Sequence, residues 1–378
     1  MAQYDALVLG TGGVGSAALY HMARRGLRVL GLDRFPPPHD RGSSHGQTRI
    51  IRQAYFEHPD YVPLLRRSYD LWEELGRQSS RPLVHLPGLL QVGPAEGSII
   101  RGVRESAHQY DLPIEEFTAH QIEQRWPVFA APPKLVGVFE RQAGYLMVEA
   151  CVEAHLQAAS RAGAELKAGV TVHGWSSDSR GIQINTDHGT FAAERLVIAA
   201  GAWAPGVLAE LGMKLTVLRK PLYWYACDEP GFDAVSGLPA FLYDLPEGVF
   251  YGFPKLDADG VKLGQHSGGD PVSDPLMLNR EIDSADRSRV EAFAAQCLRG
   301  VSRQLTRHCV CMYTMTPDEH FVVDLHPVDK RIAIAAGLSG HGFKLTSVIG
   351  EVLADLVTQG QTDLPIDFLS LSRPALRG

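Results

Sequence analysis

The sequence predicts an α/β fold, with a parallel sheet and covering helices, joined to a second region of antiparallel β-strands. Three observations lead to this prediction. Residues 5–33 have the pattern strand, glycine turn, helix, strand, and residues 331–357 repeat strand, glycine turn, helix. Residues 215–317 instead carry short β-type runs. Because the two α/β segments stand at opposite ends of the chain, the α/β domain is expected to be discontinuous.

The composition is that of an ordinary globular protein. The chain has 378 residues, of which 45% are hydrophobic and 21% charged, so two domains are expected. A net charge of −7 argues against a nucleic-acid partner, and no apolar run is long enough to predict a membrane span. Five cysteines without metal-type spacing favour a reducing compartment and no metal site. A cytoplasmic location is therefore expected.

The first glycine turn follows an apolar run at residues 6–9. Gly10 permits a tight turn, Gly12 allows the backbone to approach a pyrophosphate, and Gly15 lets the following helix lie close to the strand. The N-terminus of that helix presents free N–H groups and a positive dipole to phosphates. Asp33, at the end of the second strand, is placed to accept ribose hydroxyls. The segment is predicted to bind a dinucleotide.

The second glycine turn contains Gly337, Gly340 and Gly342, and a helix is expected to start near Phe343. Two such turns at opposite ends of the chain suggest an extended cofactor with two contact regions, which suits FAD better than NAD. A helix N-terminus is also a favourable neighbour for the flavin edge that gains negative charge on reduction. The alternative is a structural loop between a strand and a helix.

These patterns divide the chain into an FAD-binding, Rossmann-like domain and a substrate domain built on an antiparallel sheet. The first comprises residues 1–84, 145–214 and 318–378, and the second residues 85–144 and 215–317. The elements expected along the chain are helices over 62–78, 147–162 and 284–299, a strand near 170–172, a hairpin within 181–203, and strands over 216–228, 248–254, 260–266 and 308–316.

Several side chains are placed for chemistry. His45, Arg49 and Arg52 lie close together after Asp33, and Arg52 can clamp a substrate carboxylate in bidentate fashion, unless the group is a solvated basic face. On strands, residues an even number of positions apart share a face. Lys262 would then share a face with His266, although a lysine or histidine in such a position can also be a surface or structural residue. Cys311 would share a face with Tyr313, although a buried cysteine can also be inert.

Taken together, the segments closely resemble the monomeric sarcosine oxidase family with its N-methyltryptophan oxidase relatives. These are flavoprotein amine oxidases of the D-amino-acid-oxidase and glutathione-reductase fold type. The resemblance covers nearly the whole chain, in order, and its most specific motifs are SHGQTRIIR, CMYTMTPDEHF and SGHGFK. Departures from the family pattern are Ser44 in place of a histidine and Gln47 in place of an acid, both in the loop expected to wrap the cofactor.

The resemblance implies roles for individual residues. Cys311 would carry the flavin through a thioether, Arg52 and Lys344 would pair with the substrate carboxylate, and Lys262 would activate oxygen. His45 and Arg49 would lie against the flavin ring, and both, with Lys262 and His266, are the expected catalytic residues. The other expected contacts to substrate or FAD come from Tyr251, Tyr313, Leu242, Arg34, Ser43 and Val172, together with Asp33, Lys344 and the glycines 10, 12, 15, 340 and 342.

The expected reaction is oxidation of a secondary N-methyl α-amino acid, most simply sarcosine, by O₂ and water to the demethylated amino acid, formaldehyde and H₂O₂. The expected enzyme is a monomer that binds a small amino acid and O₂. Three alternatives stay open. The substrate can be N-methyltryptophan or another N-methyl amino acid, or a cyclic imino acid such as pipecolate or proline. The enzyme can also be a dehydrogenase that uses an acceptor other than O₂, although Lys262 argues against it.

Overall fold

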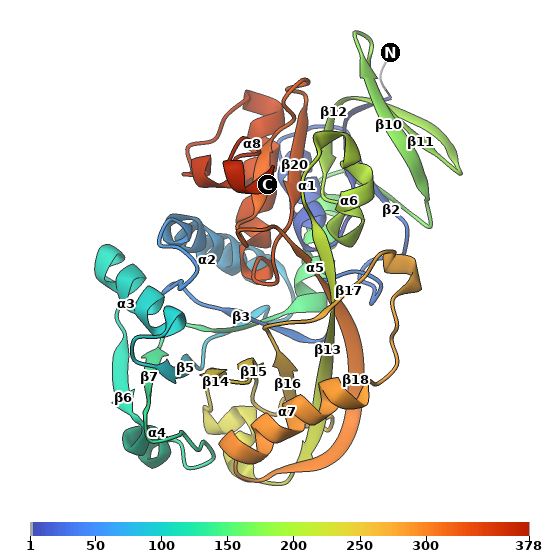
Figure 1. The fold of residues 1–378 in the computed structure, drawn as a ribbon. Helices are drawn as coiled ribbons and strands as arrows, with labels where there is room; N and C mark the ends of the chain where they lie inside the picture. Colours follow the sequence, from blue (N-terminus) through green and yellow to red (C-terminus); the bar gives the residue numbers. More distant parts are fainter. Residues whose placement is uncertain (1–2, 378) are drawn as a thin grey trace.

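Three β-sheets organise the computed structural model, which describes residues 3–377. A mostly parallel sheet with its helices forms the upper half of the molecule in Figure 1, and a mostly antiparallel sheet forms the lower half. A small three-stranded sheet lies between them. This arrangement confirms the fold class predicted from the sequence.

The upper sheet is parallel through its centre, in the order β20, β12, β1, β2, β9, with a hairpin and β19 added in antiparallel orientation. Its central strands are almost wholly apolar and buried, as expected where helices cover both faces. Its strands are β1 (Tyr4–Leu9), β2 (Val29–Asp33), β9 (Glu165–Ala168), β10 (Val172–Asp178), β11 (Gly181–Thr186), β12 (Gly189–Ile198), β19 (Val322–Leu325) and β20 (Ile332–Ala336).

Four helices pack on one face of the upper sheet and form one hydrophobic core with it. They are α1 (Gly13–Ala23), α2 (Tyr61–Gln78), α5 (Val148–Arg161) and α8 (Thr346–Gln359). Helix α1 is buried along its whole length because α5 and α8 pack against it. The short helix α6 (Ala204–Val207) and the C-terminal segment cover the opposite face.

The lower sheet has the order β17, β13, β16, β15, β14, β5, β7, β6, and β18 pairs with β13. All its pairs are antiparallel except β14 with β5. Its strands are β5 (Leu89–Pro94), β6 (Glu115–Thr118), β7 (Leu135–Glu140), β13 (Thr216–Cys227), β14 (Ala240–Leu245), β15 (Gly248–Gly252), β16 (Val261–Gln265), β17 (Asp270–Pro271) and β18 (Val301–Met315). The helices α3 (Ser98–Tyr110), α4 (Ala119–Arg125) and α7 (Ser284–Cys297) surround it.

The small sheet pairs β3 (Thr48–Ile51) with β8 (Gly144–Met147), and β8 with β4 (Val84–His85). It joins segments from both sides of the domain boundaries predicted at residues 84 and 145. Neither this sheet nor helices α3 and α4 were predicted. The other helices and strands that were given positions lie within a few residues of them, except that β18 begins at Val301 and the strand near residue 170 starts at Val172; no positions were predicted for β5, β6, β7 and β14.

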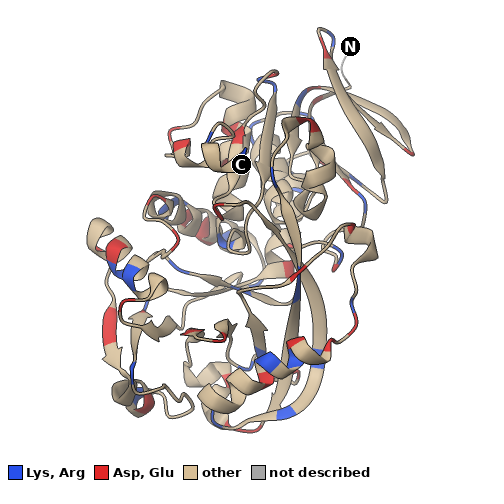
Figure 2. Ribbon diagram, in the orientation of Figure 1, with Lys and Arg blue, Asp and Glu red and all other residues tan. Residues whose placement is uncertain are grey.

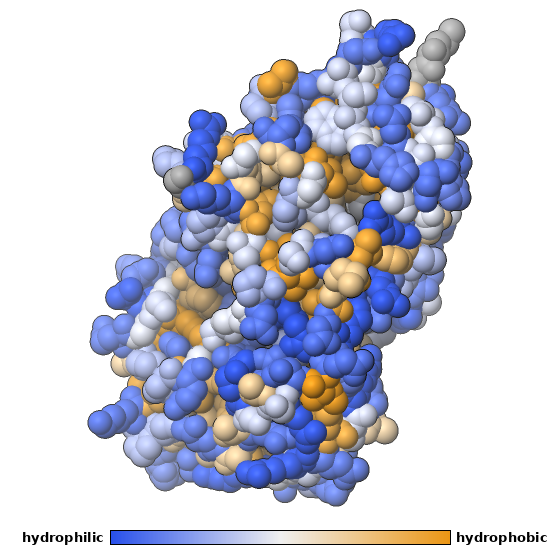
Figure 3. All heavy atoms as spheres, turned by 45° about the vertical axis from the view of Figure 1, so that its right-hand side comes forward, coloured by the Kyte–Doolittle hydropathy of each residue, from blue (hydrophilic) through white to orange (hydrophobic). Residues whose placement is uncertain are grey.

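The surface is polar and carries both signs of charge. Figure 2 shows acidic and basic positions interspersed along the ribbon, for example on α7, where Arg287 pairs with Glu291 and Arg289 with Asp286. Figure 3 shows apolar atoms gathered around the middle of one face, where the upper and lower halves meet. Among the described residues, no helix is both long enough and apolar enough to cross a membrane.

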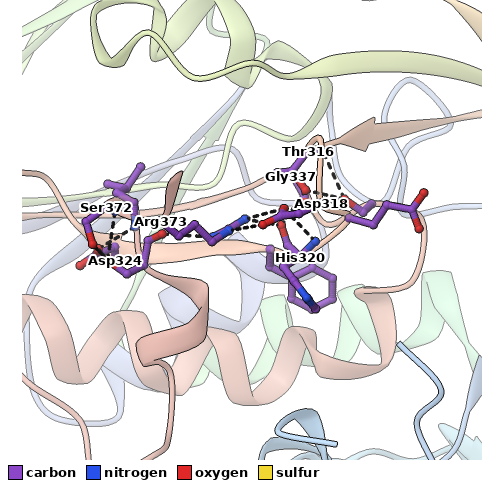
Figure 4. Close-up of polar contacts among 12 residues, drawn as sticks. Thr316, Asp318, His320, Asp324, Gly337, Ser372 and Arg373 are labelled. Atoms are coloured by element: carbon purple, nitrogen blue, oxygen red, sulfur yellow. Dashed lines mark hydrogen bonds and ion pairs between the residues drawn. The ribbon is translucent and has the colours of Figure 1, made fainter. Parts of the chain in front are cut away.

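The C-terminal segment is tied to the loop between β18 and β19 (Figure 4). The Arg373 guanidinium donates to both carboxylate oxygens of Asp318, at 2.7 and 3.2 Å, and to the His320 carbonyl at 2.6 Å. Asp324 accepts hydrogen bonds from Ser370 and from the Leu371 N–H. The Arg373 and Asp318 side chains are only 12% and 20% exposed, so the pair is shielded from solvent. The tail therefore fixes a loop that lies beside the second glycine turn.

Replacement of Arg373 by alanine is expected to lower the free energy of unfolding by about 2 kcal/mol, because four charge-assisted hydrogen bonds are lost together. Urea denaturation of the wild-type and R373A proteins measures this change. The matched control is R180A, since Arg180 pairs with Asp178 at a side-chain exposure of 82% and should contribute nothing measurable. Equal effects of the two substitutions would contradict a structural role for Arg373.

Candidate active site

The first glycine turn joins β1 to α1 with very little free space. Gly10 has a φ of +85°, which favours glycine, and a Cβ there would lie 2.5 Å from the Ala199 carbonyl oxygen. A Cβ on Gly15 would lie 1.8 Å from the Gly10 carbonyl oxygen. Helix α1 therefore approaches β1 so closely that only glycine fits at Gly15, and its N-terminus faces the cavity described below.

Asp33 ends β2 and binds the turn itself. Its carboxylate accepts hydrogen bonds from the Thr11 N–H (2.7 Å) and hydroxyl (2.9 Å), from the Phe35 N–H (3.1 Å), and lies 3.3 Å from Nε2 of His39. Burial opposes ionisation of Asp33, but the hydrogen bonds from His39, Thr11 and Phe35 lower its pKa below the usual value. The aspartate is thus held as an anion at the end of the cavity where a ribose is expected.

The second glycine turn joins β20 to a 3₁₀ turn, η6 (Phe343–Leu345), and then to α8. Gly340 has a φ of +79°, and a Cβ there would lie 2.4 Å from the Tyr313 ring. Ser339, a non-glycine residue with a φ of +46°, is held in that conformation by its hydroxyl, which donates to the Gly337 carbonyl and accepts from the Thr316 N–H. The turn therefore presents its backbone directly to Tyr313 on β18.

One extended cavity connects the two turns. The residues that line it include the predicted cofactor contacts Gly10, Gly12, Asp33, Arg34, Ser43, Arg49, Val172, Gly340 and Gly342, together with Met312, Tyr313 and Thr314 of β18. It runs from Asp33 and Val172 past the N-terminus of α1 to the second turn. A dinucleotide with an adenosine at one end and a ring system at the other fits this shape, because backbone without side chains borders its middle.

The two departures from the family pattern make their own contacts. The Ser44 hydroxyl accepts a hydrogen bond from the Gly13 N–H at 3.0 Å, at the start of α1. Gln47, with a φ of +73°, donates through its side chain to Asp257 and accepts from the Trp224 indole, while its backbone N–H donates to Glu149. The loop that carries both residues is therefore firmly anchored beside the cavity.

Cys311 lies on β18 directly behind this cavity, 1% exposed. Its sulfur is 3.2 Å from the Arg49 guanidinium, which donates to it, and 3.3 Å from the Ser43 carbonyl. Burial raises the pKa of the thiol, but Arg49 and His45 outweigh burial and lower the pKa to about 6. His45 is also buried, and its Nε2 has no hydrogen-bond partner among the described residues. A thiolate is the nucleophilic form of cysteine, so Cys311 is electrostatically prepared for covalent chemistry.

A second, smaller cavity of about 50 Å³ adjoins the first, whose volume is about 230 Å³. Arg49, Tyr313, Gly340 and Phe343 line both cavities, so they mark the junction. The predicted substrate residues that line the small cavity are Arg52, Leu242, Tyr251, His266, Tyr313 and Lys344. The other side chains that line it were not predicted as substrate contacts; they include Ile50, Phe56, Glu57, Phe253 and His341.

Arg52 is 3% exposed and pairs with Glu57, with 2.5 Å between Nη2 and Oε2. Its guanidinium also lies over the rings of Tyr55 and Phe56, at 4.5 and 4.3 Å from their centroids. Burial raises the pKa of Glu57, but Arg52, His341 and Lys344 outweigh it and lower the pKa to about 2. The other oxygen of Glu57, Oε1, is buried without a hydrogen-bond partner among the described residues and lies 3.8 Å from Nδ1 of His341.

Lys262 lies behind β3 and lines neither cavity as the structure describes them. It is 1% exposed, and its Nζ donates to the carbonyls of Gly46 (2.5 Å) and Thr48 (2.8 Å) and to the Thr48 hydroxyl (3.1 Å). Burial and the charge of Arg49 lower its pKa well below the usual value. The ammonium is thus one strand away from the junction where a flavin ring is expected.

His266 lies on the opposite wall of the small cavity, with Nδ1 3.4 Å from the Tyr313 hydroxyl. Burial and the nearby Lys220 lower the pKa of His266 to about 3, so the imidazole is neutral. Lys220, which sequence reasoning missed, donates to the carbonyls of His266, Ser267 and Gly268 and lies over the Tyr313 ring. Lys220 therefore holds the loop that carries His266. The one indication that Lys220 lies near the site is its position opposite Cys311 in the pairing of β13 with β18.

A nucleotide cavity framed by two glycine turns, with a cation-lined pocket at its end, defines a dinucleotide-dependent oxidoreductase. The family model described as FAD dependent oxidoreductase matches residues 5–356. The chain belongs to the FAD-dependent oxidoreductase family, and the family resemblance predicted from its motifs is confirmed.

The relatives cover nearly the whole chain. It is 37% identical to a monomeric sarcosine oxidase of Arthrobacter sp. (strain TE1826), over 99% of this chain and 97% of that one. It is also 37% identical to an N-methyl-L-tryptophan oxidase of Yersinia pestis (strain Pestoides F), over 98% and 99%. Among solved structures, NikD, an unusual amino acid oxidase essential for nikkomycin biosynthesis, superposes with a TM-score of 0.86 at 26% identity, covering 98% of each chain.

Substitution of Gly15 by alanine is expected to lower the free energy of unfolding by about 2 kcal/mol and to reduce the amount of FAD that copurifies, because α1 must move away from β1. The control is G76A in α2, where a new Cβ meets nothing within 4 Å and should stabilise the helix by about 0.5–1 kcal/mol. Urea denaturation and flavin absorbance measure both effects. Normal flavin content in G15A would contradict the assigned close packing.

Proposed function

We propose that this protein is an oxidase of secondary N-methyl α-amino acids, with sarcosine as the first substrate. The reaction consumes O₂ and water and releases the demethylated amino acid, formaldehyde and H₂O₂. One observation carries the proposal: two buried basic side chains, Arg52 and Lys344, line a small cavity that adjoins the end of the nucleotide cavity. The names of the relatives, sarcosine oxidase and N-methyl-L-tryptophan oxidase, supply the substrate class.

The residues of the small cavity have different roles in binding the substrate. Arg52 and Lys344 bind the substrate carboxylate by charge-assisted hydrogen bonds. Tyr251, Tyr313 and neutral His266 line the side toward the junction and orient the amine end. The apolar side chains of Phe56, Leu242 and Phe343 exclude water. FAD, when bound, accepts the electron pair of the broken C–H bond and passes it to O₂.

The proposal includes covalent attachment of FAD through Cys311 and a monomeric, cytoplasmic protein. The low pKa of Cys311 and its contact with Arg49 support the attachment. Lys262 is proposed to place positive charge near the site of O₂ reduction, which favours an oxidase over a dehydrogenase with another acceptor. The same cavity residues also serve the chemistry of bulkier N-methyl amino acids and cyclic imino acids, which are the alternative substrates.

The test of the proposed function is peroxide production by the purified holoenzyme with sarcosine, N-methyltryptophan, pipecolate and proline. We expect the highest kcat/KM with sarcosine and about one H₂O₂ per formaldehyde. R52Q should lower kcat/KM for sarcosine by at least about 100-fold, because the carboxylate loses a bidentate partner. Turnover with an artificial electron acceptor but without peroxide would instead identify a dehydrogenase.

Acid precipitation tests the attachment of the flavin. We expect the yellow colour to stay with the wild-type precipitate and to be released from C311A, because the thioether cannot form without the sulfur. C309A is the matched control, since Cys309 lies two residues away on the same strand and should leave the colour bound. Release of flavin from the wild-type protein would remove Cys311 from the covalent proposal while leaving the FAD fold intact.

A further inference from the structure

The side chain of Lys344 is buried, 4% exposed, and has an unusual set of partners. Its Nζ lies 2.6 Å from the His341 carbonyl and 3.3 Å from the Tyr55 hydroxyl, and these are its two hydrogen-bond acceptors among the described residues. No carboxylate of the described residues lies within 4 Å of it. A protonated lysine has three N–H donors and a neutral one has two. The protein therefore supplies as many acceptors as a neutral amine needs.

Two other buried lysines each have one more oxygen acceptor than Lys344. Lys220 donates to three backbone carbonyls, and Lys262 donates to two carbonyls and a hydroxyl. Each has one oxygen for each N–H of an ammonium group. Lys344 has one oxygen fewer than either, although it is equally buried and is expected to face an anion.

The charges around Lys344 also disfavour its protonation in the absence of substrate. Arg52 lines the same cavity, and its partner Glu57 is the carboxylate that acts on Lys344. Tyr55 and His341 contact Lys344 directly, and Arg49, Tyr251, His266 and Tyr313 line the same cavity. Burial and Arg52 outweigh the attraction of Glu57 and lower the pKa of Lys344 well below its usual value.

We propose that Lys344 is a neutral amine in the free holoenzyme and takes up the proton that the substrate ammonium gives up on binding. An N–H bond of the substrate breaks and leaves its electron pair on nitrogen, while an N–H bond forms at Nζ of Lys344. The total charge of the complex is unchanged. The inference rests on the proposed function, because it requires a ligand with both a carboxylate and an ammonium group.

This transfer serves binding and chemistry at once. The new ammonium group has a third N–H, for which the substrate carboxylate is the acceptor, so the anchor becomes charged only when an anion is present to pair with it. The substrate amine gains the lone pair that C–H oxidation requires. A lysine charged from the start would attract the carboxylate but leave the substrate nitrogen protonated.

Proton uptake measured by calorimetry tests the inference. The holoenzyme is titrated near neutral pH with methoxyacetate, which has an ether oxygen where sarcosine has nitrogen and therefore brings no proton. In buffers of different ionisation enthalpy, binding is expected to take up about one proton per ligand from solvent. Glycine, the expected demethylated product, carries its own ammonium proton and should show uptake close to zero.

The K344R variant separates Lys344 from the other titratable groups. Arginine stays protonated, so methoxyacetate should still bind K344R but with proton uptake near zero. In K255R, the same change at a lysine that lines neither cavity and pairs with Asp233, uptake should stay at about one proton. The rise of sarcosine turnover with pH should also move to higher pH in K344R, toward the ordinary pKa of the amine. Flavin absorbance verifies that each variant is folded.

The outcomes distinguish this inference from the proposed function. Methoxyacetate that binds the wild-type protein without proton uptake, or uptake that persists in K344R, overturns the role of Lys344 while peroxide production from sarcosine leaves the oxidase function standing. Failure of methoxyacetate to bind, together with no peroxide from any N-methyl amino acid, overturns the proposed function and the inference with it.

Discussion

The burial of cationic side chains where the three sheets meet is the constraint on which the rest of the site depends. A buried charge costs several kcal/mol unless other groups compensate it. Arg49 is compensated by the Cys311 sulfur and by backbone carbonyls, Arg52 by Glu57, and Lys262 by three oxygens of the segment around β3. The contacts of Arg49 with Cys311 and of Lys262 with Gly46 and Thr48 join segments more than 200 residues apart in the chain, so these contacts set the electrostatics of the site and also hold its architecture together.

The features predicted from sequence are those determined by local chemistry. The glycines of the first turn indicate a close approach of backbone to backbone, and a Cβ on Gly10 or Gly15 would collide with a carbonyl oxygen. The apolar run before Gly10 and the aspartate after the next strand have the spacing of one strand–helix–strand unit. The family resemblance extended this to the cavity, since Arg52, Lys344, Tyr251 and His266 line it together.

The contacts that could not be predicted are those that depend on tertiary packing. Glu57 follows Arg52 by five residues, but only the burial of both side chains reveals their pairing. Tyr55 meets His341, which is 286 residues away, and Glu140 accepts hydrogen bonds from the Gln53 and Ala54 N–H groups, which hold the backbone directly after Arg52. Helices α3 and α4 were missed because Pro and Gly between short apolar runs concealed their helical periodicity. Domain boundaries and individual catalytic roles stay predictions.

The paired charges of Arg52 and Glu57 bear on how a carboxylate is recognised. Because Glu57 neutralises Arg52, the cavity without a neighbouring charge on Lys344 has little net attraction for an anion. Arg52 by itself is a cation that is already paired. A lysine that becomes charged with the ligand supplies the missing attraction without the cost of holding an unpaired charge beforehand. An amino acid brings the proton that this requires, whereas a simple carboxylate must draw it from solvent. The same buried groups that bind a carboxylate therefore favour carboxylates that carry an amine.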